Sequence, residues 1–259
     1  MKKLTLTFLA AATMCAAATA QPKVKYLSTY TDKLQVEQLQ VPGQTARISR
    51  TLYAGYNSIC LPMSLTAEQL QTAAPGVRVE RFAAIHQDGA TLCLYFVDCT
   101  EAGIEAGSPY LIFSPKTQSL TASTANAKAI GLELNSVRLS DQRGNTVVFG
   151  SSWQTLNGSN NRYGIPAKQD VEVLESVLIP TDPDKKFLPT RCGFTWDAQT
   201  STANAIQICH INSLSQLPTG ITSVSTDKEG KAIYDLSGRR ATTAKKGIYV
   251  VDGKKTAVK

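Results

Sequence analysis

The sequence predicts an all-β protein, built from antiparallel β-sandwiches with one short helix and a small C-terminal β-meander. Three observations support this prediction. Short strand patterns bounded by turn residues recur along the chain, a single segment carries both start and stop signals of a helix, and 42% of the 259 residues are hydrophobic. A chain of this composition can bury a sizeable core, and a sandwich is the usual arrangement for many short strands.

Two hairpins are predicted around polar turns at residues 87–90 and 141–145. Their strands are residues 77–85 and 92–97 for the first hairpin, and 137–139 and 146–149 for the second. Residues 91–97 are apolar on both faces, which is typical of a strand buried between two layers. Residues 171–179 predict a further strand that ends at Pro180.

The one predicted helix begins at Thr66-Ala-Glu-Gln69, which fits a capping box. Leu70 follows in the sequence, and Pro75-Gly76 ends the helix.

Four segments are predicted along the chain. They are a leader at 1–20, a first β module at 21–125, a second β module at 126–220, and a basic tail at 221–259. The two modules form either separate domains or a single shared sandwich.

The leader has the layout of a secretory signal. Lys2 and Lys3 precede an apolar run over residues 4–18, and Ala18-Thr19-Ala20 is a small-x-small cleavage site before Gln21. Cys15 raises the alternative of a lipoprotein, but bulky Met14 stands where a lipobox needs a small residue. No other apolar run is long enough to span a bilayer, so we expect no transmembrane segment.

The positive charge of the chain is concentrated in the tail. The whole chain has 27 Lys and Arg residues against 20 Asp and Glu residues, and residues 221–259 hold nine of the basic and four of the acidic ones. Residues 21–220 are balanced, so nucleic acid is not an expected partner. Residues 233–236 and 247–251 predict strands, and Asp252-Gly253 predicts a type I′ turn that places Val251 opposite Lys254.

The tail also resembles a known kind of segment. Tyr234-Asp-Leu-Ser-Gly-Arg-Arg240, followed by Lys245-Lys-Gly-Ile-Tyr-Val-Val-Asp-Gly-Lys-Lys255, is similar to the C-terminal sorting domains of type IX secretion in Bacteroidota-type bacteria. The resemblance implies the secretion machinery as a partner and a secreted or cell-surface location.

A second resemblance lies in the body. Tyr56-Asn-Ser-Ile-Cys-Leu-Pro-Met63, with the capped helix and Ala106-Gly-Ser-Pro-Tyr-Leu-Ile112, is similar to a module of secreted proteins from the same bacteria. It covers residues 45–125, and 126–215 loosely. Those proteins usually have Trp in place of Tyr56 and Phe in place of Met63, and some are adhesin-like. The resemblance implies a surface role and carries over no site residue.

Five cysteines follow the leader, an odd number that leaves at least one thiol unpaired. Residues 191–196 and 205–211 predict strands around a polar connection. If these strands form a symmetric hairpin, Cys192 lies opposite Cys209 at a distance that a disulfide can bridge. Cys60 and Cys93 lie in apolar runs, where the alternative is a small buried hydrophobic side chain.

The sequence shows no recognisable catalytic or metal-binding constellation. There are two histidines, and His210 is adjacent to Cys209 on a predicted strand, so their side chains point to opposite faces. His86 precedes a turn. The His and Cys spacings do not match a zinc site, and Asp182-Pro-Asp184 lacks the later ligands of a calcium loop. We therefore expect neither a metal nor a cofactor, and no enzymatic activity.

Loop 151–163 is the best predicted binding site. Trp153 and Tyr163 are accompanied by the amides of Asn157, Asn160 and Asn161, and such side chains stack on sugars and bind their hydroxyl groups. Trp196 beside the next polar loop is a second candidate. The alternative is that the aromatic residues belong to the core and the amides only form turns.

These observations predict an exported, non-catalytic protein with adhesin-like binding of a glycan or of a host or matrix protein. Two alternatives remain open. One is a structural or assembly subunit of the cell envelope. The other is a hydrolase whose site is assembled from distant residues.

Overall fold

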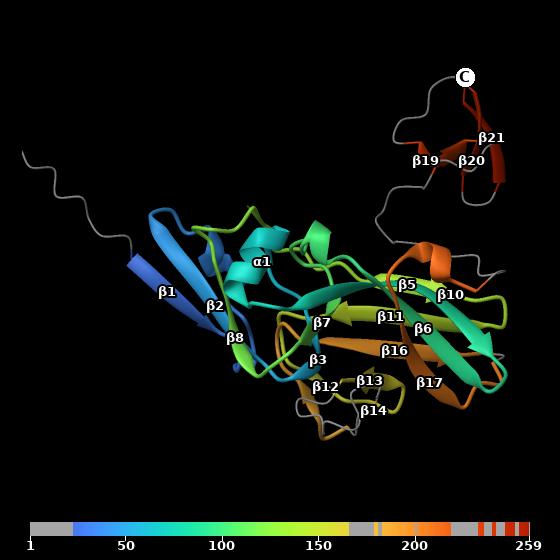
Figure 1. Ribbon diagram of the computed structural model, residues 1–259, viewed down its shortest axis with the longest axis horizontal. Coiled ribbons are helices and arrows are strands. Elements are labelled where there is room, and N and C mark those ends of the chain that lie inside the picture. The colour runs from blue at the N-terminus through green and yellow to red at the C-terminus, as the bar shows by residue number, and fades with distance from the viewer. Residues whose placement is uncertain are drawn as a thin grey trace, which may run out of the picture.

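The computed structural model describes residues 23–165, 179–180, 183–199 and 201–218, together with the tail strands. The protein is all-β with one α-helix among these residues, which confirms the predicted fold class (Figure 1). The leader lies outside the described residues, as do residues 171–178 of the strand predicted at 171–179.

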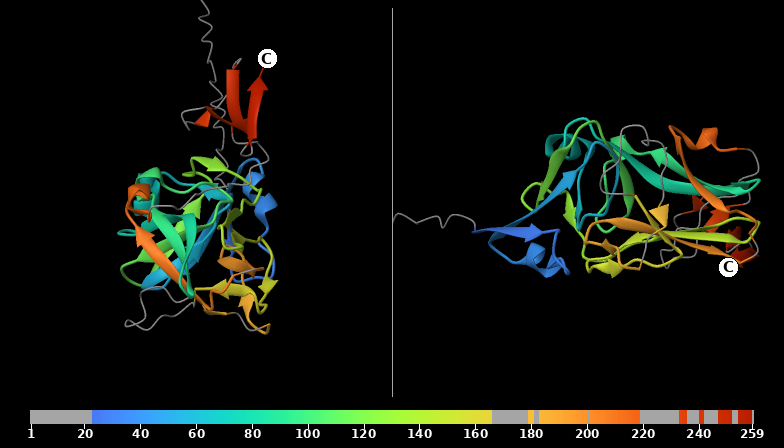
Figure 2. Two further views of the ribbon diagram at one scale, coloured as in Figure 1. Left: turned by 90° about the vertical axis from the view of Figure 1, so that its right-hand side faces the viewer. Right: turned by 90° about the horizontal axis from the view of Figure 1, so that it is seen from below.

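Two five-stranded sheets form the sandwich. The first sheet has the order β17-β6-β5-β7-β3, with strands β3 (Gly55–Ile59), β5 (Arg78–Asp88), β6 (Thr91–Asp98), β7 (Tyr110–Ser114) and β17 (Ala205–Ile211). The second sheet has the order β10-β11-β16-β13-β14, with strands β10 (Val137–Ser140), β11 (Asn145–Ser151), β13 (Arg162–Gly164), β14 (Ile179–Pro180) and β16 (Cys192–Ala198). The right-hand view of Figure 2 shows the two layers edge-on.

Smaller sheets extend this sandwich. A three-stranded sheet contains β1 (Lys23–Ser28), β2 (Gln44–Leu52) and β8 (Gln118–Ser123). Two strand pairs are β4 (Met63–Ser64) with β9 (Ala129–Ile130), and β12 (Leu156–Asn157) with β15 (Lys186–Phe187). Short 3-10 helices span Val36–Gln40, Thr100–Ala102 and Leu214–Gln216.

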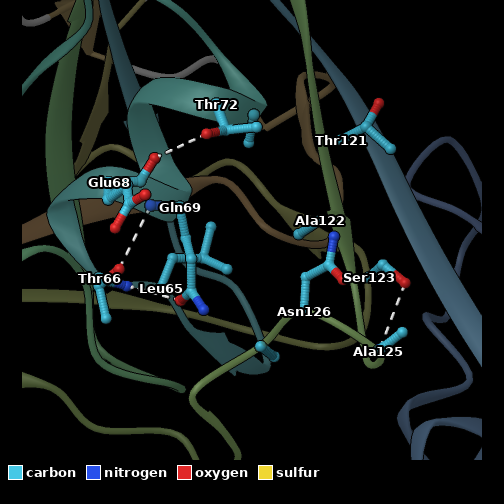
Figure 3. A pocket seen from close by; sticks show the side chains of 12 residues that line it. Leu65, Thr66, Glu68, Gln69, Thr72, Thr121, Ala122, Ser123, Ala125 and Asn126 are labelled. Atoms are coloured by element: carbon cyan, nitrogen blue, oxygen red, sulfur yellow. Dashed lines mark hydrogen bonds between the residues drawn. The ribbon is translucent and has the colours of Figure 1, made fainter.

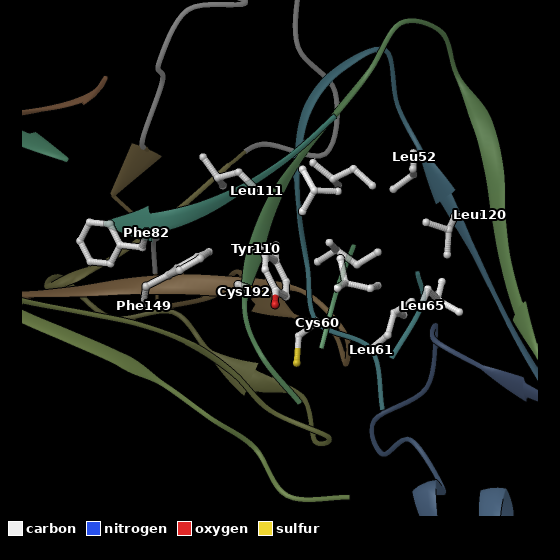
Figure 4. Close-up of a cluster of buried hydrophobic side chains, with 14 of the residues drawn as sticks. Leu52, Cys60, Leu61, Leu65, Phe82, Tyr110, Leu111, Leu120, Phe149 and Cys192 are labelled. Atoms are coloured by element: carbon white, nitrogen blue, oxygen red, sulfur yellow. The ribbon is translucent and has the colours of Figure 1, made fainter. Parts of the chain in front are cut away.

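Four phenylalanines hold the two large sheets together. Phe82 of β5 and Phe96 of β6 stack at 5.1 Å, and their edges meet Phe149 of β11 and Phe194 of β16. Phe149 and Phe194 stack at 4.4 Å. Edge-to-face contact between two stacked pairs is a favoured aromatic geometry, and Figure 4 shows Phe82 facing Phe149 across the core.

Helix α1 (Ala67–Ala73) confirms the predicted capping box. The Gln69 N–H donates to the Thr66 hydroxyl at 3.2 Å, and the Thr66 N–H donates to Gln69 Oε1 at 2.9 Å. Buried Leu70 faces the core from this helix. Both predicted hairpins are also confirmed, as β5–β6 and β10–β11.

Strand β17 does not pair as the sequence predicted. Instead of forming a hairpin with β16, it lies parallel to β6 at the edge of the first sheet, with Ile208 opposite Leu94. The alternating apolar residues Ile206 and Ile208 of β17 face the core, and an edge position beside β6 buries them. The predicted second module thus contributes a strand to the sheet of the first.

The tail forms its own sheet of β18 (Ile233–Asp235), β19 (Arg240–Ala241), β20 (Gly247–Val251) and β21 (Lys254–Val258). The register of β20 and β21 confirms the predicted hairpin, since Val251 pairs with Lys254 and Tyr249 with Thr256.

Candidate functional site

Trp153 belongs to the core, which corrects its assignment to the binding site. Its side chain is buried, and its indole N–H donates to the Leu132 carbonyl at 2.7 Å. Its own carbonyl accepts a hydrogen bond from the Leu34 N–H. A ring held in this way offers no face to a ligand. For Trp153 the alternative prediction, that the aromatic residue belongs to the core, is therefore correct.

The structure brings together the other predicted binding residues. The Tyr163 and Trp196 rings lie 6.1 Å apart on neighbouring strands β13 and β16. Both are half-buried, and their buried sides pack against the core. The backbone N–H of Trp196 donates to the backbone carbonyl of Asn161 at 3.0 Å, which fixes the loop before β13 against β16. We call Asn157, Asn160, Asn161, Tyr163 and Trp196 the loop surface.

The three asparagines of the loop surface, Asn157, Asn160 and Asn161, are exposed to solvent. The Ser159 hydroxyl donates to Asn161 Oδ1 at 2.9 Å, and the Arg162 guanidinium donates to the Asn157 carbonyl. Amides carry both donors and acceptors, so these exposed asparagines can form hydrogen bonds with the hydroxyl groups of a ligand.

Trp196 is positioned by a buried polar network that links the two large sheets. Its indole N–H donates to Asn145 Oδ1 at 3.0 Å, and Asn145 Nδ2 donates to Gln87 Oε1 at 3.0 Å. Asn145 and Gln87 are almost fully buried. Because buried amides are costly unless bonded, this network holds the inner edge of the Trp196 ring in one orientation.

A second polar cluster lies on the first sheet, around Glu80 of β5. His210 Nδ1 lies 2.5 Å from Glu80 Oε2, and the Tyr56 hydroxyl donates to Glu80 Oε1 at 3.1 Å. The Tyr56 and His210 rings stack at 4.2 Å with an interplanar angle of 10°. Tyr56 comes from β3 and His210 from β17, the two opposite edges of the sheet, so the sheet must coil strongly to bring them together.

The chemistry of this cluster follows from its burial. The Glu80 side chain is 5% exposed and the His210 side chain 26% exposed. Burial and the neighbouring Glu80 carboxylate raise the pKa of Tyr56, so its hydroxyl stays a donor. Arg78 lies against the outside of the cluster, 4.9 Å above the Phe113 ring and 3.4 Å from the Tyr56 hydroxyl.

Sequence reasoning missed this cluster because its members are far apart in the chain. Alternation on the predicted strand correctly separated Cys209 from His210. The free Cys209 thiol lies near the Cys93 thiol, whereas His210 contacts Glu80. No local signal could name Glu80 as the partner, since 130 residues separate the two.

The predicted disulfide between Cys192 and Cys209 is wrong. Cys192 is buried in the second sheet, Cys209 lies in the first sheet, and both are free thiols. Cys60 and Cys192 are both core residues near Tyr110 (Figure 4), as the alternative for Cys60 predicted. Burial raises the pKa of Cys192 to about 12, so this thiol is unreactive at neutral pH.

An open groove of about 750 Å³ lies between α1 and β8 (Figure 3). Small and polar side chains line it, among them Gln69, Thr121 and Asn126. Glu68 is its single ionisable lining residue and no aromatic ring lines it, so the groove has fewer features of a ligand site than the loop surface.

Comparison with known proteins gives no match to a protein-family model, a curated protein or a solved structure. In the part of the chain that the structure describes, no helix is long and apolar enough to cross a membrane. The same residues contain no group of three or more metal-ligating side chains.

Proposed function

We propose that this protein is an exported, non-catalytic binding protein that recognises glycans through the loop surface. One observation carries the proposal. Asn157, Asn160 and Asn161 are exposed in the segment that leads into β13, and the half-buried Tyr163 and Trp196 rings lie 6.1 Å apart on the adjacent strands β13 and β16. Rings give apolar contact area and amides give directional hydrogen bonds, the combination that a sugar requires.

Export is supported by the sequence of the leader and by the resemblance of the tail to a sorting domain. Its test is the intact mass of the native protein from culture and cell-surface fractions. We expect a chain that starts at Gln21. A chain that retains Met1 would contradict export through this leader.

Glycan binding is tested by screening the purified protein against a panel of surface and matrix glycans. The double variant Asn157→Ala/Asn160→Ala removes two exposed amides, and we expect at least about tenfold weaker binding, since one hydrogen bond contributes about 1 kcal/mol. The control is Asn212→Ala, which removes an exposed amide after β17. Equal binding by both variants and the unaltered protein would exclude the loop surface.

The cluster around Glu80 favours a second candidate function, a hydrolase. A carboxylate that accepts a hydrogen bond at His210 Nδ1 fixes the ring orientation, as in the base of a hydrolytic triad. The second ring nitrogen of His210, Nε2, is then available to act as the general base. The test is cleavage of p-nitrophenyl acetate. Activity that falls at least about hundredfold in His210→Gln but persists in His86→Gln would establish this candidate and replace the first.

A further inference from the structure

Arg50 is a buried cation without a buried anion beside it. It lies on β2, is 4% exposed, and its Nη1 donates to the Thr190 carbonyl at 2.6 Å. Its Nε–H is fully enclosed and has no hydrogen-bond partner. A buried charge is strongly unfavourable unless it is paired and its donors are satisfied.

Two further unsatisfied polar atoms lie next to it in the chain segment that it contacts. The Thr190 hydroxyl is buried without a partner, as is Nη1 of Arg191. Thr190 also has a backbone φ of 69°, the only positive value among the described non-glycine residues, which is strained for a β-branched residue. Native proteins seldom leave buried polar atoms unsatisfied, and here three belong to Arg50 and to the two residues Thr190 and Arg191 of the segment that Arg50 contacts.

The described residues supply no counter-charge for this pair of arginines. No Asp or Glu among them forms an ion pair with Arg50 or Arg191. The ionisable groups that act on Arg50, apart from Arg191, are the Cys192 and Cys60 thiols and the Tyr30 hydroxyl. Burial keeps both thiols protonated at neutral pH by raising their pKa, so neither is an anion.

Arg50 nevertheless remains charged. Its burial, and next the positive charge of Arg191, lower its pKa to about 10, which is still well above neutral pH. The Arg191 guanidinium lies 5.2 Å from the centre of the Tyr30 ring. Tyr30 is 53% exposed, in contrast to the 4% exposure of Arg50.

We propose that a small inorganic anion of the halide class, chloride in a biological setting, binds between Arg50, Thr190 and Arg191. The two guanidinium N–H groups and the hydroxyl are the donors that such an ion needs, and it would supply a negative charge that the described residues do not. A compact ion fits best because all three unsatisfied atoms are enclosed. The site would stabilise the contact of β2 with the segment before β16.

The direct test is a crystal of the full chain soaked in sodium bromide. We expect an anomalous peak within hydrogen-bond distance of Arg50 Nε. An ordered water, or no peak at this position, would overturn the proposal, whatever other bromide sites occur on the surface.

Thermal unfolding gives an independent test in solution. With gluconate replaced by chloride at constant ionic strength, we expect Tm to rise by about 5 °C and then saturate. Arg50→Met should abolish this response, while Arg47→Met, which removes an exposed arginine from the same strand, should keep it. The same rise in both variants would contradict specific binding.

A second variant, Thr190→Gly, keeps the proposal testable even if Arg50→Met does not fold. It removes the hydroxyl and relieves the positive φ, so we expect a folded protein whose Tm responds to chloride at concentrations about tenfold higher. An unchanged midpoint of the response would exclude the Thr190 hydroxyl as a ligand and with it the proposed site.

Discussion

The Glu80 carboxylate is held by a partner at each of its two oxygens. Its two oxygens are bonded to His210 and Tyr56, and its side chain is almost completely buried. A carboxylate in this position depends on both partners, because a buried charge that loses a partner keeps its desolvation penalty.

We therefore expect His210→Ala to lower the free energy of unfolding by about 1–3 kcal/mol at neutral pH. Urea unfolding of the variant and of the unaltered protein measures this difference. His86→Ala is the matched control, since His86 is a half-buried histidine of β5 for which we expect a change within about 0.5 kcal/mol. Equal effects of the two substitutions would show that the bond to Glu80 contributes nothing.

Tyr110 gives a prediction about alkaline pH. Burial raises its pKa to about 12 from an ordinary value of 10, so the folded state favours the protonated phenol. Its contribution to stability is complete below about pH 10 and is lost as the pH rises towards 12.

The measurement is the difference in unfolding free energy between the unaltered protein and Tyr110→Phe as a function of pH. Between about pH 9 and 11 we expect this difference to shift by about 1 kcal/mol in favour of the variant. A difference that stays constant over this range would contradict the raised pKa.

At the scale of single elements, the start of helix α1 is determined by its own sequence. The capping box of Thr66 and Gln69 satisfies backbone groups that a seven-residue helix otherwise leaves open. Thr66→Ala should cost about 1 kcal/mol of unfolding free energy. Thr72→Ala is the control because the Thr72 hydroxyl bonds back to the Glu68 carbonyl within the helix, and it should be nearly neutral.

Gly103, which follows the 3-10 helix Thr100–Ala102, lies close to the backbone at the start of α1. Its φ is 73°, and a Cβ at this position would lie 2.1 Å from the Leu65 carbonyl oxygen. Gly103→Ala combines backbone strain with a backbone clash, so we expect a loss of about 3 kcal/mol or more in thermal or urea unfolding.

Gly89 in the β5–β6 turn is the matched control for this substitution. Its φ is 55°, also positive, but nothing lies within 4 Å of a Cβ built there. Gly89→Ala should cost about 1 kcal/mol, from the left-handed conformation alone. Similar losses at both glycines would show that the close approach to Leu65 is unimportant.

On the scale of the whole molecule, the two predicted modules are joined in one structure. Strand β17 comes from the second module and completes the sheet of the first, and the four phenylalanines pack across the interface of the large sheets. These contacts couple the two sheets energetically.

Phe149→Ala should therefore destabilise both sheets together, by about 3–5 kcal/mol. Hydrogen exchange read by mass spectrometry measures this, and protection should fall in β5 and β6 as well as in β11. The control Tyr26→Ala removes a ring that is 67% exposed on β1 and should leave both sheets unchanged. Loss of protection confined to the second sheet would show that the sheets unfold independently.

Local patterns in the sequence determined the fold class, the capped helix, both short hairpins and the register of the tail. Each depends on residues within about a dozen positions of one another, where alternation, caps and turn residues act directly. The export signals also lie in contiguous segments, and they remain predictions.

Only the tertiary structure decided what pairs over long distances. The sequence joined 191–196 to 205–211 because they are neighbours in the chain, but β17 pairs with β6, where Ile206 and Ile208 pack against the core. Cys209 therefore lies in the first sheet, away from Cys192. The same long-range packing buries Trp153, brings Glu80 to His210, and encloses Arg50 beside Thr190. Such contacts depend on how sheets coil and stack, and no periodicity of one segment specifies them.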